Sequence, residues 1–354
     1  MRLSRLLALL LLVVISGFYF LEKNDLTPEQ AVQNINTVVE EKKNVLKTKA
    51  MPAKRSIIPL EGDLYRWIGK PVKELSAVYG KPAKEYESPY GYQWLVYTQS
   101  EGQYIQFGVK DNKIASIYAI GDELSLEPIQ IGQSYDSLKE NFSFTNEVTY
   151  SEGLSSYTFK LKDEELRSRP LVKITDNYFI QLYFDSFTGK LSSVRVLSGD
   201  ILLLHRPYGM EYRGSLPEKP SFSDKEWNKI EADMEQQIFD ITNIIRFNHG
   251  KPALKWDETV SNVAYLHSKD MAQNNYFSHY GLDGDGLKER LAAEEVFYRS
   301  AGENIAAQYP DAPSAMHGWL NSKGHREALL KDDYTHLGVG VYRFYYTQNF
   351  LKIQ

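Results

Sequence analysis

The first hydrophobic feature of the chain is an uncharged stretch at its N-terminus. Residues 6–21 are almost wholly apolar and follow Arg2 and Arg5. A membrane span needs about 20 apolar residues and the core of a signal peptide about 7–15, so this length lies between the two. The pattern predicts an export signal retained as a membrane anchor over residues 1–21, with residues 22–354 outside the cytoplasm. The alternative is secretion after the signal is cleaved.

A helical pattern follows the apolar stretch. Thr27 is a favoured N-cap residue, Pro28 suits the first helical turn, and apolar side chains then recur at helical spacing until Pro52. We expect residues 22–56 to form a helical stalk between the anchor and the first folded domain. A partner-binding helix is the alternative.

Residues 57–205 change to short runs rich in Tyr, Val, Ile and Phe, bounded by Gly, Asp, Asn and Ser, which is typical of β-strands. The region is internally repeated, and each copy predicts a short helix followed by antiparallel strands. No copy gathers histidines or a Ser, His and Asp set, so we interpret the region as a structural or binding module. The matching segments are Ile68-Gly69 and Ile131-Gly132, predicted helices 70–79 and 135–141, residues 104–107 and 179–182, residues 113–117 and 190–194, and Gly121-Asp122 and Gly199-Asp200.

Proline and glycine mark the boundary before the last domain. Residues 206–233 comprise a linker rich in Pro and Gly, up to Pro220, and the start of a helix. Residues 234–354 form the C-terminal domain. Periodicity in and just before this domain predicts helices at 224–248 and 257–274 and a pair of strands at 337–342 and 345–350.

Composition narrows the function. The chain has 354 residues, 42% hydrophobic and 25% charged, which is typical of a folded protein of two or three domains. A formal net charge of −5 supplies no overall basic field, so we expect no nucleic-acid partner. The absence of cysteine excludes disulfides, Cys-ligated zinc, thiol nucleophiles and iron–sulfur clusters. Any site chemistry must use imidazole, carboxylate or hydroxyl groups.

Six of the seven histidines lie between residues 249 and 336, which directs the search for a site to the C-terminal domain. The chain has no HExxH, GxxxxGK[ST], GxGxxG or GxSxG motif, so zincin, nucleotide, dinucleotide and α/β-hydrolase chemistry have no support. Asp283 and Asp285 fail the EF-hand spacing and predict a turn.

Three histidines have structural interpretations. His249 precedes Gly250 and fits the end of a helix. His267 lies among apolar residues of a predicted helix and is expected in the core. His317 lies two residues before a tryptophan and is expected to be a packing or surface residue.

Eight short motifs occur in order in the last third of the chain. They are Asn243-Ile-Ile-Arg246, Leu254-Lys-Trp-Asp257, His267-Ser-Lys-Asp-Met271, Phe277-Ser-His279, Ala301-Gly-Glu-Asn-Ile-Ala306, Trp319-Leu-Asn-Ser-Lys-Gly-His-Arg326, Leu337-Gly-Val-Gly340 and Tyr346-Thr-Gln348. Together they resemble a CAP domain, of the cysteine-rich secretory protein, antigen 5 and pathogenesis-related 1 superfamily, in its cysteine-free bacterial form. The repeated module resembles the CAP-associated domain that precedes CAP domains in exported Bacillus-type proteins.

The resemblance implies an α+β fold. It implies a C-terminal three-layer α-β-α CAP sandwich, preceded by the duplicated β-rich α+β module and the N-terminal membrane helix.

The resemblance also implies a cleft that in many members holds two histidines and two acidic residues and takes a divalent metal. By motif position His279 and His325 match the histidines and Glu303 matches the first acid, whereas Ser322 stands where the second acid is expected. The implied ligands of a metal such as Zn²⁺ are therefore His279, His325 and Glu303, with Ser322 or water completing the shell at reduced affinity. Glu303 is the candidate catalytic residue, which would orient or deprotonate a water.

Several functions follow from this cleft. In the first, His279, Glu303, Ser322 and His325 line a binding site for a lipid, an envelope polymer or a protein partner at the cell surface, as the resemblance implies. In the second, they form a metal-dependent hydrolase of peptide or wall polymer. A purely structural knot of buried imidazoles and carboxylate, in a protein that acts as a spacer, is the third. We expect binding rather than catalysis, because no nucleophile is evident and the second acid is missing.

Overall fold

The structure, a computed structural model, describes residues 60–98 and 102–353. The membrane anchor predicted for residues 1–21 and the stalk predicted for residues 22–56 lie outside the described residues. Among the helices of residues 60–98 and 102–353, none is long and apolar enough to cross a membrane.

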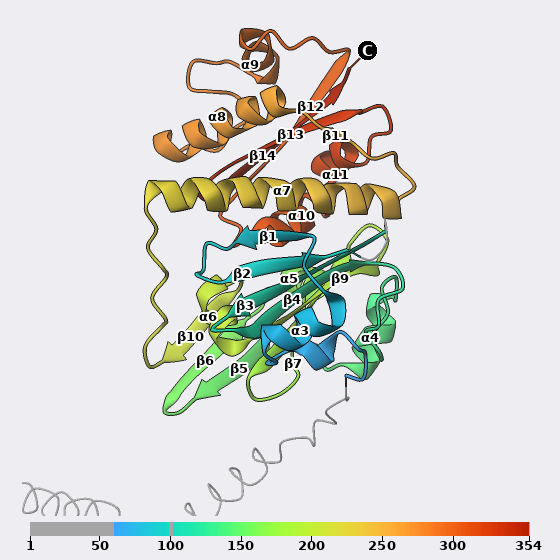
Figure 1. The fold of residues 1–354 in the computed structure, drawn as a ribbon, viewed down its shortest axis with the longest axis vertical. Coiled ribbons are helices and arrows are strands. Elements are labelled where there is room, and N and C mark those ends of the chain that lie inside the picture. The colour runs from blue at the N-terminus through green and yellow to red at the C-terminus, as the bar shows by residue number, and fades with distance from the viewer. Residues whose placement is uncertain (1–59, 99–101, 354) are drawn as a thin grey trace, which may run out of the picture. The chain divides into compact units, whose positions relative to one another are not determined.

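The repeated module is built on a seven-stranded antiparallel sheet (Figure 1). The first copy supplies four strands and the second supplies three, and the last strands of the two copies pair in the middle. The strand order is β1 (Lys84–Glu87), β2 (Gln93–Tyr97), β3 (Gln103–Lys110), β4 (Lys113–Gly121), β9 (Lys190–Ser198), β8 (Tyr178–Asp185) and β7 (Leu171–Lys173).

The two copies make equivalent contacts. Gly69 and Gly132 have φ of 78° and 84°, a backbone conformation that glycine adopts without strain. Their N–H groups donate to carbonyl oxygens near the start of β4 and β9, at 2.7 and 2.8 Å. The repeated Ile-Gly pair therefore marks the same turn in each copy. The helices of the module are η1 (Tyr65–Trp67), α3 (Val72–Tyr79), α4 (Tyr135–Asn141), α5 (Asp163–Ser168) and α6 (Gly199–His205).

A second, three-stranded sheet corrects the linker prediction. Its strands are β5 (Glu147–Glu152), β6 (Ser155–Lys160) and β10 (Gly209–Arg213), with β6 in the middle. The prediction of a linker is wrong for residues 209–213, which pair with β6 along their whole length. Proline and glycine indicate where a chain turns, but they do not report a long-range partner, and here the Tyr212 ring stacks on Tyr157 of β6.

The C-terminal domain has three layers (Figure 1). A four-stranded sheet in the order β11 (Lys255–Trp256), β13 (His336–Tyr342), β14 (Tyr345–Lys352) and β12 (Ser300–Ala307) forms the middle layer. Helices α8 (Glu258–Asn274) and α9 (Leu287–Ala293) cover one face, and α7 (Asp224–Asn248), α10 (Ala312–Leu320) and α11 (Lys323–Leu329) cover the other. The predicted helix at 224–248 is confirmed, and Asp257 is the N-cap of α8.

Two glycines of β13 bring α8 close to the sheet. A Cβ atom at Gly340 would lie 1.8 Å from the backbone nitrogen of Tyr265, and one at Gly338 would lie 2.3 Å from that of Ser261. Real Cβ atoms do not approach backbone this closely. The alternate residues Leu337, Val339 and Val341 point to the opposite face and join the main core.

Helices α7 and α10 lie between the seven-stranded sheet of the module and the four-stranded sheet of the C-terminal domain (Figure 1). The two domains therefore share one helical layer. A single hydrophobic cluster contains Trp94 and Tyr183 of the module together with Ile238 and Trp319 of the C-terminal domain. Residues from both domains therefore lose their apolar surface in the same interior.

A buried ion pair crosses this shared interior. Arg195 of β9 lies 2.7 Å from Asp311, the N-cap of α10, and neither side chain is more than 3% exposed. Ser314 donates its hydroxyl and its N–H to Asp311. Burial alone raises the pKa of Asp311, but the charge of Arg195, together with His205 and the hydrogen bonds from Ser314 and Arg195, outweighs burial and holds that pKa below its ordinary value. The pair therefore links the two domains inside their shared core.

We expect Arg195→Met to destabilise the protein by about 3–5 kcal/mol, because it leaves the Asp311 carboxylate buried without a counter-charge. Arg66→Met, which removes an ion pair that is half exposed on both sides, is the control and should change stability by less than about 1 kcal/mol. Urea unfolding followed by tryptophan fluorescence measures both. Separate unfolding transitions for the two domains in the unmodified chain would contradict the shared core.

Candidate functional site

The predicted site residues come from three segments of the C-terminal domain. His279 lies in the loop between α8 and α9, Glu303 lies on β12, and Ser322 and His325 lie at the start of α11. The loop contains the predicted turn, in which the Asp283 carboxylate accepts the N–H of Asp285 at 3.0 Å. The fold therefore brings His279 to Glu303 of β12 and the backbone of His325 to the neighbouring Asn304.

The Glu303 carboxylate has two cationic or proton-donating neighbours. His279 Nδ1 lies 2.8 Å from Oε1, and Arg290 Nη2 of α9 lies 2.6 Å from Oε2. The Glu303 side chain is 4% exposed, whereas that of His279 is 48% exposed. Because a carboxylate only accepts, His279 donates from Nδ1, and in its neutral form its Nε2 is then an acceptor.

Arg290 is the site residue that the sequence did not reveal. Besides Glu303, its guanidinium donates to the carbonyl oxygens of His279 and Asp285 at 3.1 Å each, so one side chain fixes the loop and neutralises the acid. A buried carboxylate needs a counter-charge, and this requirement alone could have indicated that a basic residue pairs with Glu303. No motif identifies which of the chain's basic residues supplies it.

His325 and Ser322 stand apart from the Glu303 cluster. Burial lowers the pKa of His325, and the charge of His279 lowers it further, so the two imidazoles are electrostatically coupled. No described side chain hydrogen-bonds the His325 ring, although its backbone oxygen accepts from the Asn304 side chain at 3.1 Å. Ser322 is the N-cap of α11 without a capping side-chain bond.

The residues present do not fit the metal that the resemblance implies. Within residues 60–98 and 102–353, no group of three or more His, Asp or Glu side chains is arranged to hold an ion. Both oxygens of Glu303 are already engaged, and the adjacent guanidinium would repel a divalent cation. Ser322 adds no negative charge. We therefore derive no step through a metal.

The pair of Glu303 and His279 resembles the carboxylate and imidazole of a hydrolytic triad. A triad also needs a nucleophile within hydrogen-bonding distance of the second imidazole nitrogen. In the described part of the chain, the hydrogen bond of the His279 ring is to Glu303, and no hydroxyl hydrogen-bonds its second nitrogen. The arrangement can accept a proton or a hydrogen bond from a ligand, but it holds no nucleophile of its own.

The other histidines have packing roles, as predicted. His267 is 2% exposed, its Nε2 lies 3.0 Å from the Ser278 carbonyl oxygen, and burial lowers its pKa. His317 packs on the Tyr183 ring of the module, and burial lowers its pKa to about 4. His249 directs Nδ1 to the Ile245 carbonyl oxygen at the end of α7.

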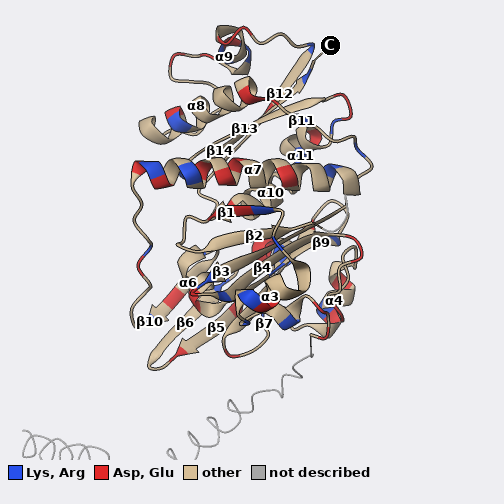
Figure 2. Cartoon of the chain, viewed as in Figure 1, with Lys and Arg blue, Asp and Glu red and all other residues tan. Residues whose placement is uncertain are grey.

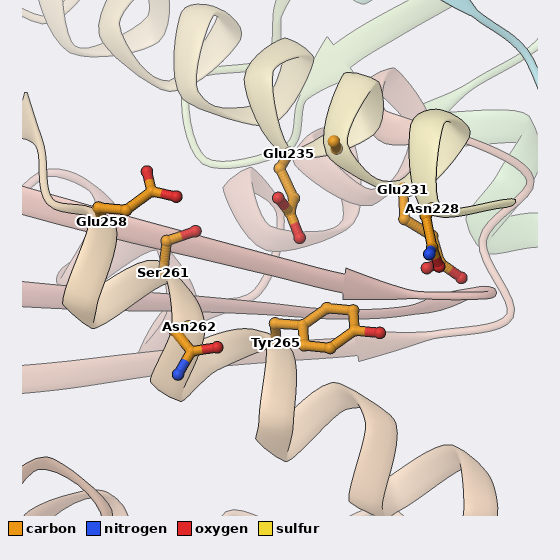
Figure 3. Close-up of a pocket in the computed structure, with 8 residues that line it drawn as sticks. Asn228, Glu231, Glu235, Glu258, Ser261, Asn262 and Tyr265 are labelled. Atoms are coloured by element: carbon orange, nitrogen blue, oxygen red, sulfur yellow. The ribbon is translucent and has the colours of Figure 1, made fainter. Parts of the chain in front are cut away.

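A separate cavity of about 240 Å³ lies between α7 and α8 (Figure 3). None of the residues that line it belongs to the group formed by His279, Glu303 and Arg290. In Figure 3 the side chains of Glu231 and Glu235 point from α7 toward Tyr265 of α8. The lining residues are Asn228, Glu231, Ala232, Glu235, Glu258, Ser261, Asn262 and Tyr265.

This cavity lies where β13 lacks a neighbouring strand, because β11 pairs with only its first two residues. Two carboxylates of α7 accept main-chain N–H groups here, where a neighbouring strand would otherwise accept them. Glu235 accepts the N–H of Val341, and Glu231 accepts the N–H of Arg343, both at 2.9 Å. The pKa of Glu235 is raised to about 8, mainly by burial and also by the nearby acids Glu231 and Glu258, against the Val341 hydrogen bond that lowers it.

Known proteins match the chain over both domains. Residues 68–208 match the family model of the CAP-associated N-terminal domain, and residues 239–353 match that of the cysteine-rich secretory protein family. The chain is 41% identical over 350 residues to the "Uncharacterized membrane protein YlbC" of Bacillus subtilis, covering 98% of each chain.

Two solved structures share the architecture. One, an extracellular protein containing an SCP domain from Bacillus anthracis, has a TM-score of 0.78 and 40% identity, with 85% of this chain and 99% of that chain covered. The other, a cysteine-rich secretory protein from Staphylococcus aureus, has a TM-score of 0.72 and 27% identity, with 82% and 95% covered.

We expect the purified chain to hold no stoichiometric zinc after dialysis against EDTA and re-addition of the ion, because Arg290 occupies the electrostatic position of a cation. Metal content by mass spectrometry and the thermal unfolding temperature with and without zinc measure this. One zinc per chain that is lost in both His279→Ala and His325→Ala would contradict the interpretation.

We expect Glu235→Gln to flatten the pH dependence of stability. Between the ordinary pKa of 4.5 and the native value of about 8, the folded chain keeps a proton that the unfolded chain releases. Stability therefore falls by about 1.4 kcal/mol per pH unit across that window, and the variant lacks this loss. Urea unfolding at pH 5, 6.5 and 8 measures the slope. The control is Glu140→Gln at an exposed position of α4, and equal slopes in both variants would refute the assignment.

Proposed function

The chain belongs to the cysteine-rich secretory protein (CAP) family and carries the CAP-associated N-terminal domain, and on that premise we propose that it is a ligand-binding protein of the cell surface. In this proposal the CAP cleft around His279, Glu303 and Arg290 is the recognition site. The N-terminal module holds the CAP domain rigidly, and residues 1–21 anchor the chain to the membrane.

The observation that carries the proposal is the saturation of Glu303. With Arg290 on one oxygen and His279 on the other, the carboxylate is not free to bind a metal or deprotonate a water. It acts on His279 instead, holding the ring so that the half-exposed imidazole faces outward in one orientation. A fixed polar group at an accessible surface is suited to recognition.

Exposed apolar side chains around His279 support a binding role. Phe277, Tyr280 and Leu282 lie on the same loop, and each is more than half exposed. Apolar groups that a monomer leaves in water next to a polar cluster are typical of an interaction site. Arg290 fixes the backbone of this loop at two carbonyl oxygens, which lowers the entropy lost on binding.

The proposed location outside the cytoplasm has two supports. The N-terminal sequence has the basic start and apolar core of an export signal. A relative of nearly equal length is called a membrane protein, and a structural neighbour is called extracellular. The absence of cysteine fits a protein that keeps its fold outside the cell through a large core rather than through disulfides.

Site-specific photocrosslinking in intact cells tests the proposal. A benzoylphenylalanine placed at Tyr280 of the full-length chain is expected to give a reproducible adduct with an envelope component, because this residue borders the cleft. The same group at Leu154, which is 92% exposed on the β5–β6 hairpin, is the matched control. His279→Ala should reduce the adduct severalfold. Equal yields at positions 280 and 154, or a cytoplasmic adduct, would refute it.

A further inference from the structure

Strand β12 forms an outer edge of the CAP sheet, because it pairs with β14 alone. In an antiparallel pair, successive residues direct their main-chain groups alternately toward and away from the partner strand. The Trp319 indole N–H donates to the Ile305 carbonyl oxygen from outside the sheet, at 3.0 Å. Ile305 therefore faces outward, and Glu303 and Ala301, two and four residues earlier, present their N–H and C=O groups along the same edge.

Solvent reaches this edge. The Glu303 side chain is 4% exposed, yet the residue as a whole is only partly buried, so its accessible surface belongs to the main chain. Among the described residues, nothing beyond the strand pairing hydrogen-bonds the Glu303 N–H or C=O. Residues 300–303 are all partly exposed, whereas residues 304–306 are buried. The open stretch is therefore 300–303, and Trp319 closes its far end.

The open edge lacks the usual protection. Natural edge strands are blunted by proline, lysine, bulges or a covering segment. Residues 300–303 are Ser-Ala-Gly-Glu, and their register with β14 is continuous. The other edge of the sheet differs, since Glu235 accepts the outward N–H of Val341 in β13 and Glu231 accepts that of Arg343 directly after it. An edge left unprotected beside a polar cleft is suited to strand addition.

Two imidazoles lie beside the open stretch. His279, from the loop before α9, bonds the Glu303 side chain, and His325, from α11, accepts at its backbone oxygen from Asn304 of the same strand. Arg290 neutralises Glu303, the one acid among the cleft residues. With Nδ1 of His279 on Glu303, its Nε2 is left to take a proton or a hydrogen bond from a ligand, and no free carboxylate opposes an acidic one. The cleft therefore complements a ligand that carries an acidic group.

We propose that residues 300–303 of β12 pair with an extended peptide that carries an acidic side chain facing His279 and His325. The inference rests on the proposed function, because it names the ligand class of the same cleft. Main-chain hydrogen bonds to Ala301 and Glu303 supply affinity, and the imidazoles select the acidic side chain. A peptide fits this edge because its N–H and C=O groups repeat with the spacing of a strand, whereas a lipid chain has no such repeat.

The test begins with a random linear heptapeptide library displayed on phage and selected on the full-length chain in detergent micelles. Selected sequences are expected to contain Asp or Glu and to bind as synthetic peptides. Methylating their amide nitrogens one at a time should lower affinity about tenfold at alternate positions only, because every second N–H reaches β12. This series leaves the protein unchanged.

Variants of the protein test the same contacts. Ala301→Pro removes the outward N–H and no bond to β14, and it should weaken binding about tenfold. Ala301→Ser keeps the amide and is the matched control, and thermal unfolding checks the fold of both. The double variant His279→Ala, His325→Ala should abolish the preference for Asp and Glu peptides over their Asn and Gln counterparts.

Three results would overturn the inference. These are a library that yields no binder, methylation effects that do not alternate, and a concentration-dependent dimer that Ala301→Pro disperses, which would assign the edge to a second copy of the chain. If one of them occurs while crosslinking at position 280 persists, only the peptide assignment fails. If the crosslink is also absent, the proposed binding function fails with it.

Discussion

The architecture depends on helix α7 being packed on both sides. One side covers the CAP sheet and the other covers the sheet of the N-terminal module, so the helix must satisfy polar groups in two directions (Figure 2). Asp233 and Asp240 bind the module, at the Glu87 N–H and the Lys84 ammonium, both at 2.7 Å. Glu235 instead accepts the N–H of Val341 in β13, and Glu231 accepts that of Arg343 directly after the strand. The acidic residues of α7 thus form hydrogen bonds with both domains, and the buried Arg195–Asp311 pair adds a further contact between them.

The need to compensate a buried charge also determines the chemistry of the cleft. A buried carboxylate requires compensation, and the chain supplies it with Arg290 rather than with an ion. With Arg290 bound to it, Glu303 orients His279 instead of acting as a metal ligand or a base. The loop around His279 is held by the same guanidinium, so the site's geometry and its electrostatics have one cause.

The two edge regions of the CAP sheet differ in how far their main-chain groups are covered. At β13, Glu235 accepts the N–H of Val341 and Glu231 that of Arg343 just beyond the strand, and a polar cavity lies beside them. At β12, the main chain of Glu303 stays accessible while its side chain is buried. Exposed edges are a liability unless they have a use, and the accessible one is the edge that borders the cleft.

Much of the fold was determined by the sequence alone, because its signals are local. The repeated Ile-Gly turn, the capping residues of α7 and α8 and the alternation Leu337-Gly-Val-Gly each specify a backbone conformation within a few residues. The ordered motifs likewise identified the CAP domain and pointed to His279 and Glu303, which lie 2.8 Å apart in the structure. Only the tertiary structure decided that β10 is a strand, that Arg290 pairs with Glu303, and that both domains share the α7 layer. These depend on contacts between residues far apart in the chain or in different segments, and neither periodicity nor composition records which distant partner a charge or a strand edge will meet.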